Sequence, residues 1–281
     1  MNNRTQLRWS VLVLLCAAMT AGCAGVGRRA KPTLVPEIAP GILEGYLPHT
    51  ALPNSMAVLP PPPAKGSAAL ALDLDIAKRS FALRGTPRWM LAISDADLTF
   101  PHAAGTFSCV LGAPITREGT PHLYMLLRRS LTDAGLSTYA AKNHYQRSRP
   151  FRVNEEPMCT PDERAFLEKD GSYPSGHTAI GWAWALILVE VAPERIDAIL
   201  TRGRAFGESR NVCNVHWHSD VMQGRFIGAS TVARLHADPA FRAELDGAKV
   251  ELAGARAKNL PPQRDCDVEA SAMTQQPTLT Q

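Results

Sequence analysis

The chain has 281 residues, of which 45% are hydrophobic, and it carries a formal net charge of +4. This length accommodates one sizeable domain together with a leader and tails. Residues 1–22 contain two arginines and no acidic residue, so the chain from Cys23 onward has 28 basic and 26 acidic side chains, a net charge of +2. That balance, with no basic run interleaved with aromatic residues, argues against a nucleic-acid-binding protein.

Residues 1–22 are typical of a secretory signal peptide. Their apolar core, residues 11–18, is too short to cross a bilayer, for which roughly 20 apolar residues are needed. Residues 20–23 resemble a bacterial lipobox, although Thr20 stands where that motif prefers Leu. Lipidation at Cys23 and plain cleavage nearby both remain open. Either route exports the protein, and we expect a periplasmic location.

Residues 23–66 hold many of the prolines and end in four consecutive ones, Pro60–Pro63. This composition predicts an extended N-terminal arm or linker without a chemical role.

From residue 67 the apolar spacing becomes helical. It predicts helices over 68–83, 89–98, 101–111, 122–134 and onward to about 147, then over 177–191, 193–209, 216–236 and 239–258. Between them, residues 151–173 are predicted to be irregular, with one or two helical turns over 162–169. Strand-like alternation is scarce, so we expect an all-α fold with a single compact helical domain over 67–258. Residues 259–281 are predicted to form a disordered tail.

Lys142 and Arg149 are seven positions apart, which is two turns if one helix continues as far as Pro150. Two cations on one face repel each other unless an anion lies between them. Taken alone, they also fit a solvated basic helix end.

Pro174–His177 precedes a long apolar run. Ser175 is a suitable N-cap for the helix that follows, and Gly176 permits a close turn. Free N–H groups and the positive dipole end make such a helix start a binding site for phosphate-like anions, with His177 at its mouth. A simple capped helix start with a surface His177 is the alternative.

Arg210, His216 and Asp220 form the third segment. If His216 and Asp220 share a helix, they stack on one face, and the carboxylate fixes the tautomer of the imidazole and frees its other nitrogen as a base or nucleophile. An ordinary surface pair is the alternative. His218 and His236 lack such a partner, and a zinc site is disfavoured because His216 and His218 would point to different helix faces.

Together, three cations, a Ser-capped helix start and two histidines describe a site for a tetrahedral oxyanion. One histidine would attack, and the other would handle the proton of the leaving group. This combination predicts a phosphate-ester hydrolase.

The three segments also resemble a known signature. Lys142-x6-Arg149-Pro150, Pro174-Ser175-Gly176-His177 and Ser209-Arg210-x5-His216-x3-Asp220 match the type 2 phosphatidic acid phosphatase superfamily. Within it, residues 66–258 resemble the bacterial class A non-specific acid phosphatases, also in Gly85–Trp89, Lys142–Tyr145, Gly171–Tyr173 and His216-Trp217.

The resemblance implies a role for each of these residues. His216 would be the nucleophile that forms a phosphohistidine, Asp220 would orient it, and His177 would protonate the leaving alcohol. The phosphate would be held by Lys142, Arg149, Ser175, Gly176 and Arg210. The family needs no metal or other cofactor, acts broadly on small phosphate monoesters such as nucleotides, sugar phosphates and aryl phosphates, can transphosphorylate alcohols, and suggests a homo-oligomer. An acid optimum follows as a hypothesis, because His177 must be protonated while His216 must not be.

Four cysteines remain once Cys16 and Cys23 are set aside, and in an oxidising compartment they suggest two disulfides. Three connectivities are possible. Cys159 and Cys213 both lie in predicted loops beside the site, which favours that pair and leaves Cys109 with Cys266.

Three rival functions share some of these features. A vanadate-dependent haloperoxidase has the same pocket, with the histidine at the position of His216 ligating vanadium; the length and the bacterial-type leader favour the phosphatase. A membrane lipid phosphatase needs several spanning helices, and the most apolar helix, 179–191, is too short. A non-catalytic phosphate-binding lipoprotein would have no use for His216 paired with Asp220.

Overall fold

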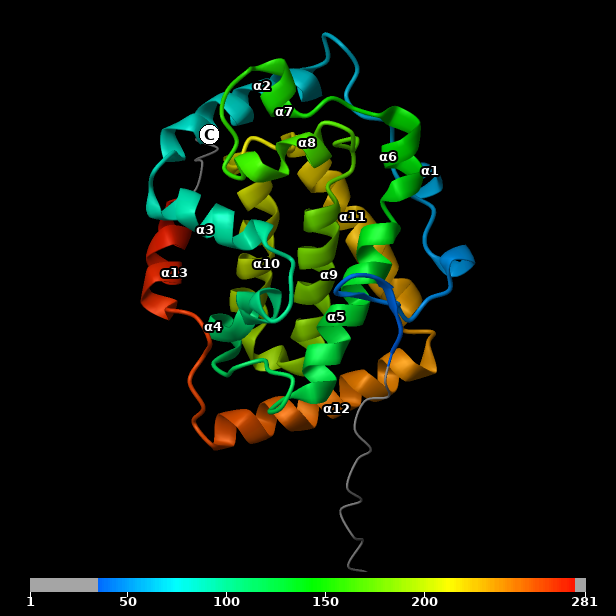
Figure 1. The fold of residues 1–281 in the computed structure, drawn as a ribbon, viewed down its shortest axis with the longest axis vertical. Helices are drawn as coiled ribbons and strands as arrows, with labels where there is room; N and C mark the ends of the chain where they lie inside the picture. The colour runs from blue at the N-terminus through cyan, green and yellow to red at the C-terminus, as the bar shows by residue number, and fades with distance from the viewer. Residues whose placement is uncertain (1–34, 276–281) are drawn as a thin grey trace, which may run out of the picture. The chain divides into compact units, whose positions relative to one another are not determined.

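The computed structural model describes residues 35–275, and nearly all of its regular structure is helical (Figure 1). The predicted all-α fold is therefore confirmed. Within the described residues, β-structure is limited to one antiparallel pair, β1 (Glu37–Ala39) with β2 (Ile42–Leu43). The predicted signal peptide, the lipobox-like segment and Cys23 lie outside the described residues.

The predicted helices are present with boundaries close to the expected ones, except that residues 102–107 form a 3-10 turn and that further helices, over 55–58, 150–153 and 266–274, were not predicted. The α-helices are α1 (Ser55–Val58), α2 (Ala68–Ser80), α3 (Pro87–Ala96), α4 (Ser108–Leu111), α5 (Pro121–Leu136), α6 (Tyr139–Tyr145), α7 (Pro150–Val153), α8 (Arg164–Leu167), α9 (Gly176–Val191), α10 (Ile196–Val212), α11 (His218–Leu235), α12 (Pro239–Ala257) and α13 (Cys266–Thr274). Short 3-10 turns are η1 (His49–Ala51), η2 (Phe81–Leu83), η3 (His102–Phe107), η4 (Pro161–Glu163) and η5 (Pro193–Arg195). No helix among residues 35–275 is both long and apolar enough to cross a membrane.

Helix α9 is the centre of the packing, and α5, α10 and α11 lie against it (Figure 1). It is apolar on nearly all sides, which is the pattern of a helix surrounded by protein. The indole of the fully buried Trp184 donates to the carbonyl oxygen of Leu127 on α5 at 2.9 Å. On the side of α10, Gly181 makes room for the ring of Phe206, which a Cβ atom would strike. Close packing of this kind fixes the N-terminus of α9, where the site lies.

The described part of the N-terminal arm, residues 35–66, is packed onto the domain, which corrects the prediction of an extended linker for this part. Leu43, Tyr46 and Leu47 are buried. The carboxylate of Asp133 on α5 accepts the backbone N–H groups of Tyr46 and Leu47 at 2.9 and 3.0 Å. Further along, the buried hydroxyl of Ser55 accepts the Ala141 N–H at 3.0 Å. Hydrogen bonds to α5 and α6 hold this described part of the arm on the domain, and the proline content of the segment does not predict them.

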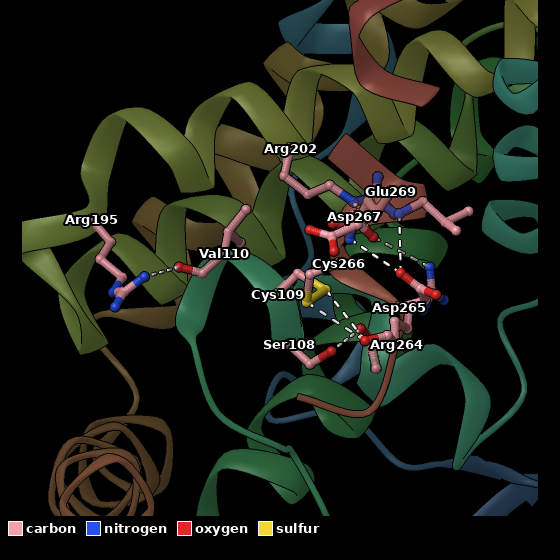
Figure 2. The surroundings of a disulfide bond; sticks show 12 residues. Ser108, Cys109, Val110, Arg195, Arg202, Arg264, Asp265, Cys266, Asp267 and Glu269 are labelled. Atoms are coloured by element: carbon pink, nitrogen blue, oxygen red, sulfur yellow. Dashed lines mark hydrogen bonds and ion pairs between the residues drawn. A yellow bond between two sulfur atoms is a disulfide. The ribbon is translucent and has the colours of Figure 1, made fainter. Parts of the chain in front are cut away.

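The tail was expected to be disordered from residue 259, but its described part, residues 259–275, is ordered and contains α13. The Cys109–Cys266 disulfide ties the start of α13 to α4, and Glu269 lies 3.3 Å from Arg202 of α10 (Figure 2). Asp265 caps the helix through the N–H groups of Asp267 and Val268. These are tertiary contacts of a short, polar helix, and a weak apolar pattern cannot reveal them.

Both disulfides expected from the sequence are present, Cys109 with Cys266 and Cys159 with Cys213. Disulfides are typical of proteins that fold outside the cytoplasm. The second one ties the irregular segment after α7 to Cys213 at the C-terminal end of α10, three residues before His216.

Candidate active site

Three chain segments meet at the N-terminus of α9. The N–H of Ser175 donates to the Asp220 carbonyl oxygen at 3.0 Å, and the N–H of His216 donates to the Arg210 carbonyl oxygen at 3.2 Å. The N–H of Ser172 donates to the Arg147 carbonyl oxygen at 2.9 Å. These hydrogen bonds join the segments that carry the phosphate-site residues predicted from the sequence: Lys142, Arg149, Ser175, Gly176, His177, Arg210, His216 and Asp220.

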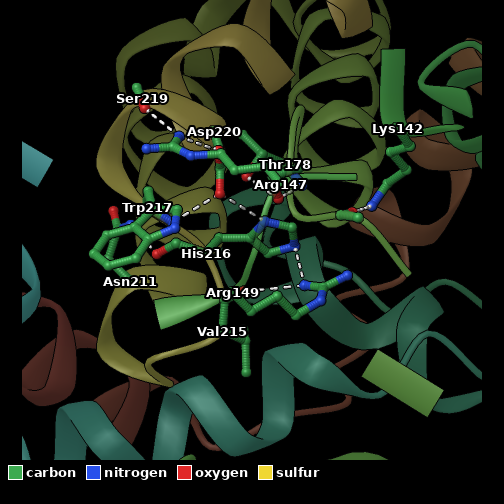
Figure 3. A network of polar contacts seen from close by, with 12 residues as sticks. Lys142, Arg147, Arg149, Thr178, Asn211, Val215, His216, Trp217, Ser219 and Asp220 are labelled. Atoms are coloured by element: carbon green, nitrogen blue, oxygen red, sulfur yellow. Dashed lines mark hydrogen bonds and ion pairs between the residues drawn. The ribbon is translucent and has the colours of Figure 1, made fainter. Parts of the chain in front are cut away.

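His216 lies in the connection between α10 and α11, two residues before α11 begins. The prediction that His216 and Asp220 share a helix face is therefore wrong, although they are in contact. Nδ1 of His216 is 3.4 Å from Oδ2 of Asp220, and the His216 carbonyl oxygen accepts a hydrogen bond from the Asn211 side chain at 2.9 Å (Figure 3). His216 is 3% exposed, so its imidazole nitrogens are almost completely shielded from bulk solvent.

The contact with Arg149 fixes the tautomer of His216. Nε2 of His216 is 3.0 Å from Nη1 of Arg149. A guanidinium can only donate, so Nε2 must present its lone pair and the proton of the neutral ring must reside on Nδ1, toward Asp220. Burial, and then the cations Arg149, Lys142 and Arg210, lower the pKa of His216 well below its usual range. The ring is therefore neutral, with a nucleophilic nitrogen facing the cations.

Asp220 is held by groups that sequence reasoning missed. Its Oδ2 accepts the Trp217 N–H at 2.9 Å, and its Oδ1 accepts from Nη1 of Arg147 at 2.6 Å. Arg147 in turn pairs at 2.7 Å with Asp73, a buried carboxylate on α2. Arg147 lies within the first motif but outside its fixed positions, and Asp73 lies far upstream, so only the fold shows their role.

Lys142 and Arg149 converge, but no continuous helix brings them together as the sequence suggested. Helix α6 ends at Tyr145, Gln146 adopts a left-handed conformation with φ of 42°, and Arg149 immediately precedes α7. The link between the two cations is Asp170. Its Oδ2 is 2.8 Å from Nζ of Lys142 and 2.7 Å from Nη2 of Arg149.

Lys142 is buried at 3% exposure, and its ammonium also donates to the Gly171 carbonyl oxygen. Burial and the nearby Arg149 lower the pKa of Lys142 to about 8, against the pull of Asp170. Gly171 is required here because a Cβ atom would lie 2.7 Å from the Lys142 carbonyl oxygen. The lysine therefore remains charged below neutral pH, with a third N–H left for a ligand.

Arg210 differs from the other two cations. It is fully buried, and none of its three guanidinium nitrogens has a hydrogen-bond partner within the described part of the chain. The nearest carboxylate there, that of Glu163, is 3.9 Å away. Burial lowers the pKa of Arg210 to about 10, so the group is still a cation. A buried cation without partners is costly unless an anion completes the site.

Ser175 is the N-cap of α9, as expected. Its Oγ atom accepts from the Thr178 N–H at 3.2 Å and from the Thr178 hydroxyl at 2.9 Å. Its own hydroxyl hydrogen remains free to donate to an anion. The N–H groups of Gly176 and His177 belong to the first turn of α9, which leaves them without intrahelical acceptors.

His177 is oriented by the last residue of α3. Its Nε2 atom is 2.9 Å from the Ala96 carbonyl oxygen, which can only accept, so Nε2 carries a proton. A second proton would therefore be held and released at Nδ1. Burial, and then Arg210, lower the pKa of His177 well below its usual range. A bound phosphate dianion would oppose the effect of Arg210 and favour the protonated ring.

Comparison with known proteins identifies the family. A model of the PAP2 superfamily matches residues 122–243. The chain is 44% identical over 209 residues to the non-specific acid phosphatase of Providencia stuartii, which covers 74% of this chain and 84% of that protein. The chain belongs to the PAP2 superfamily. It is also 42% identical over 200 residues to the non-specific acid phosphatase of Salmonella typhimurium, covering 71% of this chain and 80% of that protein. With the acid phosphatase of Zymomonas mobilis it shares 41% identity over 220 residues, covering 78% and 83%.

Other histidines of this PAP2 superfamily member lie outside the pocket's contacts. His236 pairs with Glu190 at 2.8 Å, and burial lowers the pKa of His218. Across residues 35–275, the structure contains no cluster of three or more histidine, cysteine, aspartate or glutamate side chains placed to hold a metal ion.

Proposed function

We propose that this chain is an acid phosphatase that hydrolyses phosphate monoesters through a phosphohistidine on Nε2 of His216. The observation that carries the proposal is the geometry of that nitrogen. It presents a lone pair among three buried cations, and a carboxylate lies behind the ring. Phosphoryl transfer depends mostly on positioning and on stabilising the charge of the equatorial oxygens, and this pocket provides both.

In the first step, Nε2 of His216 attacks phosphorus and the bond to the ester oxygen breaks. Nδ1 of His177 gives its proton to the departing alkoxide, so the alcohol leaves neutral. The proton on Nδ1 of His216 faces Asp220, which stabilises the positive charge that the ring acquires. The free donors of Lys142, Arg149 and Arg210 hold the phosphoryl oxygens.

In the second step, water attacks phosphorus and the N–P bond breaks, which returns His216 to its neutral form. His177, now deprotonated, accepts the proton of that water and is restored as the acid. An alcohol in place of water would yield a new ester, which is the basis of the expected transphosphorylation. No group outside the chain is needed to balance either step.

We extend the proposal to substrate and location. The groups described above would all bind the phosphate, so selection by the alcohol portion is expected to be weak, and nucleotides, sugar phosphates and aryl phosphates are expected substrates. The two disulfides fit an exported, periplasmic enzyme. Lipid attachment at Cys23 and a homo-oligomer stay as expectations from the sequence.

The test is hydrolysis of p-nitrophenyl phosphate near pH 6 by the mature protein and by His216→Ala, with and without EDTA. We expect activity that survives EDTA, is inhibited by vanadate and is lost in the variant. Loss with EDTA would contradict chemistry carried by the protein's own cations. A bromide-oxidation assay with vanadate and peroxide tests the haloperoxidase alternative, and activity there without phosphatase activity would overturn the proposal.

A further inference from the structure

Asp170 binds the two cations of the phosphate pocket that the first motif supplies. It lies in the segment between α8 and α9, and its side chain is 17% exposed. One carboxylate oxygen, Oδ2, accepts from both Lys142 and Arg149. Two buried cations so close together repel each other, and a shared carboxylate offsets that repulsion.

The backbone around Asp170 reinforces this contact. Nε of Arg149 donates to the carbonyl oxygens of Leu167 and Asp170 at 2.9 and 3.0 Å. Nη1 of Arg149 is engaged by the Val215 carbonyl oxygen and by His216. Because Asp170 takes one hydrogen of Nη2, a single N–H of Arg149 remains for a ligand.

The ammonium of Lys142 has three hydrogens. It donates one to Asp170 and one to the Gly171 carbonyl oxygen. Each cation therefore keeps one donor while its other donors fix its direction. Lys142 has four rotatable bonds, and orienting its ammonium in advance avoids an entropy cost when phosphate binds.

We propose that Asp170 is a positioning residue for phosphoryl transfer, which bridges Lys142 and Arg149 and holds both cations in place to bind a phosphate. The inference rests on the proposed function, since it concerns the same pocket. This positioning role differs from competition, in which the Asp170 carboxylate would leave the two cations when phosphate binds. In the positioning role Asp170 stays bound, and the free donors face the ligand.

The variant Asp170→Asn keeps the shape of the side chain and removes its charge. We expect kcat/KM for p-nitrophenyl phosphate to fall about tenfold to a hundredfold, as for the loss of one partner of a buried hydrogen-bonded charge pair. The inhibition constant of inorganic phosphate should rise about tenfold. Both effects should grow as pH approaches 8, because Lys142 loses the carboxylate that favours its charged form.

Glu168→Gln is the matched control, since it removes an acid two positions away. Among residues 35–275, the Glu168 carboxylate forms an ion pair with Arg164 alone, at 2.9 Å, and its side chain is 40% exposed. Its kcat/KM and phosphate inhibition should match those of the wild type. Asp170→Glu keeps the charge and should recover kcat/KM to within about threefold of the wild type, a rescue that a purely structural role for the loop would not produce.

Several outcomes would overturn the inference. Phosphate inhibition of Asp170→Asn equal to that of the wild type and of Glu168→Gln would do so, and tighter inhibition would show that Asp170 competes with phosphate. If Asp170→Asn is unfolded at the assay temperature by circular dichroism, Asp170→Glu decides, and a loss of more than about thirtyfold in that folded variant contradicts positioning by charge. A wild-type protein without phosphatase activity would instead refute the proposed function, which separates the two failures.

Discussion

Arg202 and Arg210 lie on the same helix, α10, and both are fully buried, yet their surroundings are opposite. Arg202 is 2.5 Å from Asp95 and 3.3 Å from Glu269. Arg210 has no hydrogen-bond partner among residues 35–275. Although burial lowers the pKa of Arg202, the two carboxylates outweigh it and raise that pKa, whereas burial lowers the pKa of Arg210 to about 10.

The difference shows how one helix serves structure and binding at once. At Arg202 the acids of α3 and α13 complete the ion pair within the chain, so the group joins three helices. At Arg210 the chain supplies the cation and leaves the anion to be provided by a ligand. The unbalanced positive charge that would destabilise a core is therefore placed where phosphate enters.

The largest effect is expected at the nucleophile beside Arg210. His216→Ala should lower kcat for p-nitrophenyl phosphate by about 10⁴-fold or more, as removal of a catalytic nucleophile does in enzymes whose groups act as a unit. His177→Ala should lose less with this substrate, because p-nitrophenolate leaves without needing a proton, and more with an alkyl phosphate. Steady-state kinetics with both substrates measures the contrast, and equal losses for the two would contradict the roles assigned.

Removing the paired cation Arg202 from α10 should lower the stability of the protein. Arg202→Met leaves Asp95 and Glu269 buried without their cation, so the free energy of unfolding should fall by about 3–5 kcal/mol. Urea denaturation followed by circular dichroism gives this value. Stability equal to that of the wild type would show that Arg264, 3.7 Å from Asp95, suffices as the partner.

Replacing Arg210 with methionine should have the opposite effect, because it should lower activity without lowering stability. Arg210→Met should lower kcat/KM by about 10²–10³-fold, the range for the loss of one donor to a developing oxyanion. Its free energy of unfolding should equal or exceed that of the wild type, because the variant removes a buried cation that has no hydrogen-bond partner among residues 35–275. Destabilisation like that of Arg202→Met would mean that Glu163 pairs with Arg210 more strongly than 3.9 Å suggests.

The pH profile should sharpen the comparison with a smaller effect. His216 must be neutral and His177 protonated, and burial with nearby cations lowers both pKa values. The acid limb of kcat/KM and its alkaline limb should therefore both lie below about pH 6.5, the ordinary histidine value. In Arg210→Met both limbs should move to higher pH, because one lowering cation is gone. A profile that rises steadily to pH 9 would contradict the assignment.

The sequence was sufficient to predict features that depend on residues only a few positions apart. The N-cap at Ser175 and the apolar run after it predicted α9, since capping and helical spacing depend on neighbours a few positions away. Residue spacing also nominated His177 and Arg210 for the pocket. Helix boundaries failed where a loop residue such as Gln146 turns the chain, because a left-handed conformation leaves no mark in an apolar pattern.

Tertiary structure decided which charges have partners. Asp170 and Arg147 each contact a site residue more than 20 positions away, and Asp73 is equally remote from Arg147, so no spacing rule connects these groups. The packing of the arm and of α13 was missed for the same reason. The sequence thus determined the chemical groups and the helices that carry them. Burial and pairing, which separate Arg202 from Arg210, depend on the whole fold, because a side chain loses water only when distant segments close over it.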